Sequence, residues 1–397
     1  MKNYDVIVVG GGMAGAATTY NLSQSGLNVL LLERDNITSG ASGRNGGQVI
    51  QLDGRDKDTE AMMNRLQYST RTVDLLKVYK KDLDFDFEFR QIGSIDVAAN
   101  EVEYQELKEL CHLQVQAGDK EIEFLDWKGL HEICPMLGDN FVGARYRWTD
   151  GNLSPFALTH GFVEKSIKYG AEVRTHCRVD SVVIESGRVK GVVAGDEKFA
   201  ADKVVLATSA WTKELVPELQ VIPLRSHAAL SEAIPEIKGP AFEVVYEGEI
   251  IYGSTQFKSG HILLGGGPDR PRTREEQYDY VMSWKDTQKN ASILGKLFPK
   301  LGDINIFRCW AGTMGTTPDG LPLAGKTSLA DGLFVIAGFP NGMAYISYIA
   351  KMLSHLIADK SMETDIDLFD PDRFNDLTVE IPEKYNYTIL ADYLGRL

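Results

Sequence analysis

The sequence predicts a mixed fold in which an α/β nucleotide-binding unit is combined with an α+β region. The first observation is the run YDVIVVGGGMAGAATTYNLSQSGLNVLLLER at 4–34, in which an apolar strand, a glycine-rich turn, a helix and a second apolar strand follow one another. The second is the stretch 56–117, where helix-like and strand-like patterns follow without that βαβ alternation. The predicted fold class is therefore α/β plus α+β.

The N-terminal unit carries the G-x-G-x-x-G pattern of a dinucleotide-binding turn. Gly10 permits a tight turn, Gly12 lets a pyrophosphate approach the backbone, and Gly15 lets the helix pack closely on the strand. The phosphates would lie at a helix N-terminus, where free N–H groups and the helix dipole favour negative charge. Glu33 follows at the typical offset of about 20 residues and can accept hydrogen bonds from a ribose diol. Its carboxylate would repel a 2′-phosphate, which disfavours NADP.

Composition and charge exclude several classes of partner. The chain has 42 Lys and Arg residues against 56 Asp and Glu residues, a net charge of −14, which disfavours nucleic acid and anionic membrane surfaces. No apolar run approaches the roughly 20 residues of a membrane span, and the first strand leaves no room for a signal peptide. The four cysteines, Cys111, Cys134, Cys177 and Cys309, lack metal-ligand spacing. We therefore expect free thiols, no metal site and a cytoplasmic protein.

A loop rich in glycine, serine and asparagine follows at 37–51. Its glycines favour close approach of the backbone to a flat ligand. Arg44, Asn45 and Gln48 could wrap a long cofactor here, and an ordinary surface loop is the competing interpretation.

The rest of the chain alternates between the α/β pattern and the α+β pattern. A buried strand at 203–211 ends in small residues, Ala207 among them, where a ligand can lie against the backbone. Helices are expected at 56–89, 101–117, 278–297 and from Gly342 to about Ala358, and a hairpin is expected to turn at Ser186-Gly187. We expect a discontinuous nucleotide-binding domain at 1–55, 150–222 and 310–397, and a second domain at 56–149 and 223–309.

Several blocks match a known family in their order along the chain. They are VIVVGGGMAGAATTYNLSQSGLNVLLLER, GASGRNGGQV, DGNLSPFALTHGFVEKSIKYGAEV, KVVLATSAWT, and TTPDGLPLAG through AGFPNGMA. With these blocks the chain resembles the FAD-dependent D-amino-acid oxidase superfamily, in its glycine oxidase and sarcosine oxidase branch. The resemblance implies a discontinuous Rossmann-type FAD-binding domain and a second, β-rich substrate domain.

The resemblance also implies the residues that contact FAD. These are Gly10, Gly12, Met13, Ala14, Gly15, Glu33, Arg34, Ser42, Asn45, Gly46, Gly47, Val179, and, in the segment 338–344, Gly338, Asn341, Gly342, Met343 and Ala344. The last segment leads into the C-terminal helix, whose positive end could face the flavin's pyrimidine edge and stabilise the negative charge that accumulates there on reduction. A strand and helix that only pack are the competing interpretation.

The chain departs from the family pattern at the substrate end. Met314 stands where small-amino-acid oxidases of this type place an arginine that holds the substrate carboxylate, so the carboxylate partner could instead be Arg225 or Arg44. Thr313 stands where monomeric sarcosine oxidases have the cysteine that links the flavin, and Cys309 is out of register, so noncovalent FAD is expected. The candidate substrate-pocket residues are Gln48, Arg225 and Met314.

The implied reaction is oxidation of the C–N bond of an amine or amino acid to an imine, by hydride transfer to flavin N5, with O2 or another electron acceptor. Tyr252, His227 and Lys258 are the candidate catalytic side chains, with a structural role as the competing interpretation for each. Three other functions stay open: a dehydrogenase subunit that passes electrons to a partner subunit, a glycerol-phosphate or alcohol flavoprotein, and a noncatalytic FAD-bearing subunit.

Overall fold

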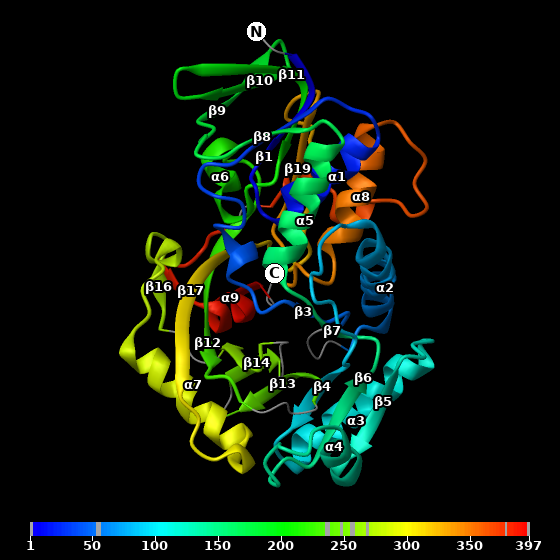
Figure 1. Ribbon diagram of the computed structural model, residues 1–397, viewed down its shortest axis with the longest axis vertical. Coiled ribbons are helices and arrows are strands. Elements are labelled where there is room, and N and C mark those ends of the chain that lie inside the picture. The colour runs from blue at the N-terminus through cyan, green and yellow to red at the C-terminus, as the bar shows by residue number, and fades with distance from the viewer. Residues whose placement is uncertain are drawn as a thin grey trace.

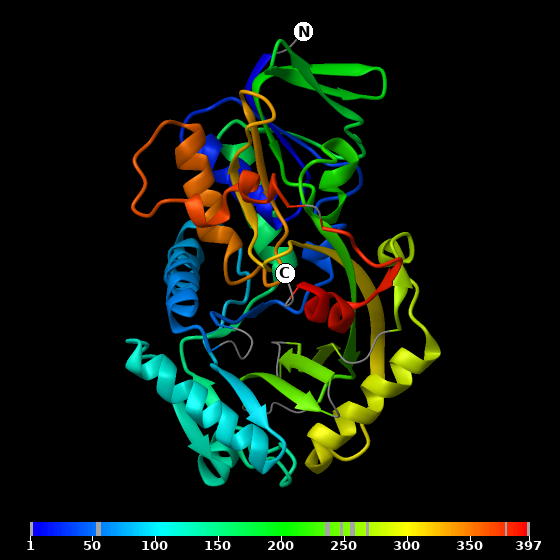
Figure 2. The same cartoon turned by 180° about the vertical axis from the view of Figure 1, so that it is seen from behind.

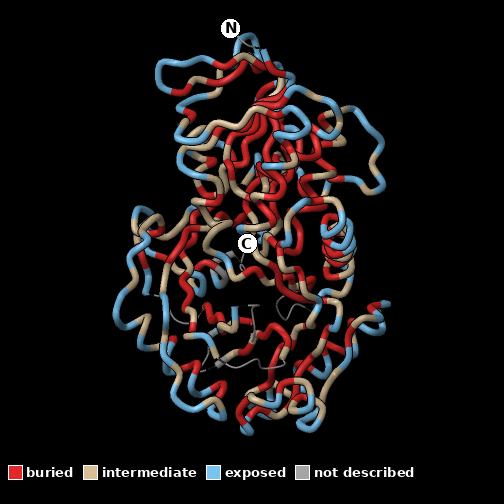
Figure 3. The backbone as a smooth tube through the Cα atoms, in the orientation of Figure 1, coloured by how far each residue is buried: buried red, intermediate tan, exposed pale blue. Residues whose placement is uncertain are grey.

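The computed structural model describes residues 3–52, 57–234, 239–246, 249–254, 259–266, 270–377 and 379–394. Two eight-stranded sheets dominate the molecule, and Figure 1 shows them one above the other. The backbone is most buried along the strands of the upper sheet and its helices, as Figure 3 shows. None of the helices in the described ranges is long and apolar enough to cross a membrane. The predicted combination of an α/β unit with a second, β-rich unit is confirmed.

The upper sheet contains the predicted nucleotide-binding unit. Its strands lie in the order β18-β19-β11-β1-β2-β8, parallel except for the pair β18–β19, and the antiparallel hairpin β9–β10 extends from β11. Helices α1, α5 and α8 cover one face, and apolar side chains on the other face form a second core, which explains the continuous apolar runs. The bounds are β1 Asn3–Val9, α1 Met13–Gln24, β2 Val29–Leu32, α5 Pro155–Lys168, β8 Glu172–Arg174, β9 Ser181–Glu185, β10 Arg188–Ala194, β11 Glu197–Leu206, β18 Leu323–Lys326, β19 Leu333–Ala337 and α8 Ile346–Ile357.

The lower sheet lies in the order β17-β12-β15-β14-β13-β4-β6-β5, and only the pair β13–β4 is parallel. One face packs its apolar side chains against α4 and α7, which leaves the other face toward the upper sheet. The bounds are β4 Ser94–Ala98, α3 Glu101–Gln116, β5 Ile122–Asp126, α4 Trp127–Ile133, β6 Gly143–Arg147, β12 Ile222–Ser231, β13 Ala241–Tyr246, β14 Glu249–Ser254, β15 Leu263–Gly266, α7 Trp284–Leu297 and β17 Ile306–Thr316.

Smaller elements join the two sheets. Helix α2 packs Leu76 and Tyr79 into the core beneath α8, whereas Met62 and Leu66 pack against α3. Figures 1 and 2 both show α2 directly below α8. The bounds are α2 Thr59–Asp82, β3 Gln48–Val49, β7 Gly151–Asn152, α6 Thr212–Leu215, β16 Arg272–Thr273, β20 Lys384–Tyr385 and α9 Tyr387–Leu394, with a 3₁₀ turn, η1, at Ala41–Gly43. The domain boundaries stay a prediction, and α2, which lies just after the first of them, packs partly into the core of the upper sheet.

Three helices begin later than the sequence analysis expects, and α2, at Thr59–Asp82 and not 56–89, also ends earlier. Helix α7 starts at Trp284 and not near 278, because Ser283 and Asp286 form a capping box that fixes its first turn. Helix α8 starts at Ile346 and not at Gly342, because 342–345 form a turn in which the N–H groups of Tyr345 and Ile346 donate to Gly342 O.

The turn between β1 and α1 brings backbone segments very close together. Gly10 has a φ of +112°, which glycine adopts without strain. A Cβ at Gly15 would lie 1.9 Å from Gly10 O and 3.2 Å from the Cβ of Ala207. A Cβ at Gly12 would lie 3.0 Å from the Oγ of Ser42, the end of a side chain that can move. Gly10 and Gly15 are therefore required by the fold, and Gly12 is not.

We expect Gly15→Ala to lower the free energy of unfolding by at least the ~1–3 kcal/mol typical of overpacking, because the added methyl group meets backbone atoms. Gly12→Ala should lower it by less than about 1 kcal/mol, because only a side chain must move. Urea unfolding of both cofactor-free variants beside the parent measures the difference. Equal losses would show that the close approach of Gly15 to Gly10 does not govern this turn.

Candidate functional site

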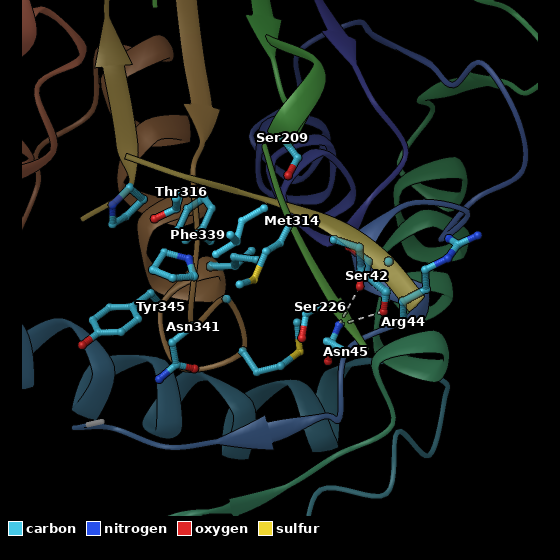
Figure 4. A pocket seen from close by; sticks show the side chains of 18 of the residues that line it. Ser42, Arg44, Asn45, Ser209, Ser226, Met314, Thr316, Phe339, Asn341 and Tyr345 are labelled. Carbon is cyan, nitrogen blue, oxygen red and sulfur yellow. Dashed lines mark hydrogen bonds between the residues drawn. The ribbon is translucent and has the colours of Figure 1, made fainter. Parts of the chain in front are cut away.

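A cavity of about 960 Å³ lies between the two sheets. It is lined by the C-terminal end of β1, the N-terminus of α1, the loop 40–48, the segment before α8 and the lower sheet. Figure 4 shows Met314, Ser226, Phe339, Asn341 and Tyr345 grouped around it, with the loop that carries Ser42, Arg44 and Asn45 beside them. The cavity therefore connects the predicted nucleotide site with the predicted substrate region.

Most of the expected cofactor residues line this cavity. They are Gly10, Gly12, Met13, Ala14, Glu33, Arg34, Ser42, Arg44, Asn45, Gly46, Gly47, Gln48, Val179, Ala207, Asn341, Gly342 and Met343. Gly15, Gly338 and Ala344 lie beside the lining residues and are not among them. Gly15 acts through packing, as its contact with Gly10 shows, and Ala344 is fully buried in the core with α8.

Glu33 is held at the end of β2 by backbone groups. Its Oε2 accepts the N–H of Gly11 at 2.6 Å and its Oε1 accepts the N–H of Asp35 at 2.8 Å. Arg34, the next residue, lies with its guanidinium 4.2 Å from the centroid of the Trp211 ring. Each carboxylate oxygen can accept a second hydrogen bond, so Glu33 can still bind a diol.

Ser42 in η1 accepts the N–H of Met13, the first residue of α1, at 2.8 Å. Asn45 fixes the rest of the loop: its Nδ2 donates to Ser42 O at 2.9 Å and its Oδ1 accepts the N–H of Gly47 at 2.8 Å. The Arg44 guanidinium lies 4.3 Å from the centroid of the Tyr280 ring and donates to Gly40 O at 3.0 Å. These contacts make the loop an ordered wall next to the positive end of a helix.

The segment before α8 forms the opposite wall. Asn341 donates from Nδ2 to Ile50 O at 2.8 Å, and the Tyr345 hydroxyl donates to Gln51 O at 3.3 Å. The side chain of Asn341 therefore connects the start of α8 to the loop that follows β3. Tyr345 and Ile346, at the N-terminal end of α8, line the cavity, so the partial positive charge of this helix end lies beside it.

Tyr252 lies on the lower sheet and faces the cavity. Its ring covers Gly265, where a Cβ would lie 2.5 Å from a ring carbon, and its hydroxyl is 3.1 Å from the Oγ of Ser226. Burial raises the pKa of Tyr252, so the side chain is a neutral hydroxyl at ordinary pH. Gln48 donates from Nε2 to Gly253 O at 2.6 Å, which ties the loop to the strand that carries Tyr252.

Met314 and Arg225, expected in one pocket, both line the cavity but project from opposite faces of the strand pair β12–β17. The register places Leu224 opposite Met314 and Arg225 opposite Thr313, and directly opposed residues share a face. Met314 is half-buried against the core that contains Leu224. Arg225 is 3% exposed, donates from Nε to Asp279 O at 2.8 Å and also donates to Val281 O. This geometry favours a structural role for Arg225.

The other two catalytic candidates receive less support. His227 is buried on the same face as Arg225, two residues along β12, although it also lines the cavity. Lys258 lies outside the described residues. Of the three candidates, Tyr252 is therefore the one whose described contacts support a position facing the cavity.

Sequence reasoning missed a set of buried polar residues at the end of the cavity away from α1. Asp150 is 1% exposed, and its Oδ1 accepts Gln51 Nε2 at 2.9 Å while its Oδ2 accepts the Ser94 hydroxyl at 2.6 Å. Arg145 and Arg147 lie beside them. Burial raises the pKa of Asp150. Arg145, Arg147 and Asp150 lie close together in the sequence, but Gln51 and Ser94 come from separate segments, so only the three-dimensional structure brings the whole set together.

An elongated dinucleotide fits the observed arrangement. The cradle at Gly12 and Ser42 leaves the helix end open to a diphosphate, Glu33 and Val179 line the part suited to adenosine, and the opposite part of the cavity reaches Asn341 and Met314. In the described part of the chain, no group of three or more His, Cys, Asp or Glu side chains could hold a metal ion.

Comparisons with known proteins agree with this fit. A subunit of opine oxidase from Rhizobium meliloti is 25% identical over 382 residues, covering 94% of this chain and 99% of its own. The beta subunit of sarcosine oxidase from Rhodobacter capsulatus is 25% identical over 378 residues, covering 90% of this chain and 87% of its own. The crystal structure of L-proline dehydrogenase from P. horikoshii has a similar fold, with a TM-score of 0.84 at 24% identity, over 96% of this chain and 100% of that chain.

A model of the family described as FAD dependent oxidoreductase matches residues 5–356. The match begins in β1 and ends in the last turn of α8, so it includes both sheets and the cavity between them. The chain therefore belongs to the family of FAD-dependent oxidoreductases, and FAD is its cofactor.

Proposed function

We propose that this protein oxidises the C–N bond of an amine or N-substituted amino acid to an imine. The observation that carries the proposal is the continuous cavity that joins the cradle at α1 to the lower sheet at Tyr252 and Met314. The names of two relatives, an opine oxidase subunit and a sarcosine oxidase subunit, support an amino compound as the substrate class.

The residues proposed to hold FAD are those of the cradle and the two walls. Glu33 would bind the adenosine ribose, the N-terminus of α1 with Ser42 would bind the diphosphate, and the wall at Asn341 would face the flavin ring. When bound, the flavin accepts the hydride equivalent from the carbon next to the substrate nitrogen. The positive end of α8 would stabilise negative charge on that side of the cavity.

The protein side chains would orient the substrate and exclude water. Tyr252, as a neutral hydroxyl held by Ser226, can donate a hydrogen bond to a substrate oxygen or accept one from a substrate amine. Met314 offers an apolar, adaptable surface that itself carries no charge to pair with a carboxylate. These features suit a substrate that is larger or less acidic at this end than glycine.

We also propose that FAD is noncovalently bound, because Thr313 carries no thiol and donates from its hydroxyl to Gln277 O at 2.7 Å. A partner subunit is proposed from the two relatives, which are both described as subunits. A cytoplasmic location is proposed from the free cysteines, which include Cys111 and Cys134 in the buried core.

We expect the purified protein to release its flavin on acid precipitation, because Thr313 has no thiol with which to bond it. The absorbance of the supernatant and of the pellet measures the partition. Flavin that stays with the pelleted chain would contradict noncovalent binding.

Glu33→Gln should weaken FAD binding by about 1.5–3 kcal/mol, roughly tenfold or more, because a charge-assisted hydrogen bond to the ribose is lost. Titration of the cofactor-free protein with FAD gives the dissociation constant. Glu197→Gln is the control, because its carboxylate pairs with Arg174 on the same sheet and does not line the cavity. If Glu33→Gln and Glu197→Gln bind FAD equally, the role given to Glu33 is wrong.

Met314→Arg should raise kcat/KM for glycine and sarcosine relative to bulky N-alkyl amines, because it supplies the paired cation that a buried carboxylate needs. Met314→Leu, which conserves volume, should leave that ratio near the parent value. Steady-state kinetics with glycine, sarcosine, proline and N-alkyl amines give the comparison. An unmodified protein that prefers glycine by a wide margin would refute the proposed role of Met314.

A further inference from the structure

The cavity continues past Tyr252 to a second end that the proposed reaction does not use. One row of side chains crosses the lower sheet from Tyr252 through Glu243 and Asp96 to Arg145, because each residue is paired with the next in the strand register. Arg147 lies two residues from Arg145 on the same strand and therefore on the same face. The floor of the cavity is continuous from the hydroxyl of Tyr252 to two arginines.

Arg147 has one guanidinium nitrogen in a close ion pair and another in a looser ion pair without a hydrogen bond. Its side chain is 5% exposed, and its Nη2 is ion-paired with Asp119, whose side chain is 1% exposed. Its Nη1 is buried and makes no hydrogen bond within the described part of the chain, and the carboxylate Oε2 of Glu121 lies 3.8 Å away. A buried charged donor without a hydrogen bond is costly, so this nitrogen is placed to bind an acceptor that enters the cavity.

Neighbouring carboxylates pair with both arginines, Asp96 with Arg145, and Asp119 and Glu121 with Arg147. The contacts of Arg145 include Nη1 at 3.3 Å from the Oε1 of Gln114 and Nη2 at 3.5 Å from the Oδ2 of Asp96. Asp150 accepts hydrogen bonds from Gln51 and Ser94, and burial raises its pKa, which disfavours its negative charge. An incoming anion would meet the two guanidinium groups among these carboxylates, and would reach Nη1 of Arg147 by displacing the partly exposed carboxylate of Glu121.

We propose that the end of the cavity lined by Arg145 and Arg147 binds a carboxylate of the substrate, distant from the carbon that is oxidised. The proposal rests on the proposed function, since it names the class of amine that the same cavity accepts. Three strand spacings separate Tyr252 from Arg145, roughly 14 Å between their backbones, so the amine and the carboxylate are separated by several bonds. Arg145 and Arg147 would provide the positive charge that position 314 lacks, for a longer amine that carries a carboxylate.

The test measures binding of a nonreactive probe, adipate, to the FAD-loaded protein by titration calorimetry, with neutral dimethyl adipate as the comparison ligand. The double variant Arg147→Gln with Asp119→Asn removes the guanidinium without leaving the buried carboxylate of Asp119 unpaired. It should weaken adipate binding at least about tenfold and leave dimethyl adipate unchanged. Asp119→Asn alone should strengthen adipate binding, because Arg147 loses its competing partner.

Arg188→Gln is the control, because this arginine is exposed and pairs with Asp331 away from the cavity. Adipate that fails to bind the parent protein, or binds the double variant and the parent equally, would overturn the proposal. Reduction of the flavin band by amines is measured separately on the same preparations. Adipate binding that depends on Arg147, in a protein that oxidises no amine, would keep this site and refute the proposed function.

Discussion

The structure depends on the close approach of Gly15 to Gly10, where the first helix crosses the end of the first strand. Because no side chain separates the two backbones, α1 starts directly above the sheet and its N-terminal N–H groups open into the cavity. Ser42 lies beside this helix end and accepts a hydrogen bond from one of its N–H groups, that of Met13. The positions of the diphosphate cradle and of the loop that carries Ser42 both follow from this one backbone contact.

The sequence predicted the upper sheet well, because its information is local. A strand buried on both faces is a continuous apolar run, and a G-x-G-x-x-G turn is contiguous, so β1, α1 and β2 are read directly from 4–34. The hairpin turn at Ser186-Gly187 was predicted for the same reason. The starts of α7 and α8 were missed, because a capping box and a tight turn determine them, and apolar periodicity reveals neither feature.

The candidate site was predicted in part, and the limit is strand register. The cofactor residues come from short contiguous blocks, and most of them line the cavity. Arg225 and Met314 come from different strands, and only their pairing decides which face each side chain takes. A shift of one residue moves a side chain to the other face, so no reasoning from composition could place Arg225 away from Met314. Asp150 and Arg147 carry no local signal for the same reason.

The lower sheet also explains how substrate recognition can change while the cofactor site stays constant. Gln48 ties the cradle loop to β14 through the backbone oxygen of Gly253, a contact that does not depend on the side chains of the sheet floor. A positively charged partner for the substrate can therefore be absent at position 314 and present at Arg145 and Arg147 on β6 without disturbing that contact.

The pairing of Arg147 with Asp119 limits how much the arginine-lined end of the cavity lowers the stability of the fold. Asp119 keeps Arg147 partly neutralised when no ligand is present, which lowers the penalty of burying a charge. The remaining nitrogen, Nη1, is desolvated before any ligand arrives. A carboxylate that reaches Nη1 would therefore form a charge-assisted hydrogen bond without any further cost of removing water from this donor.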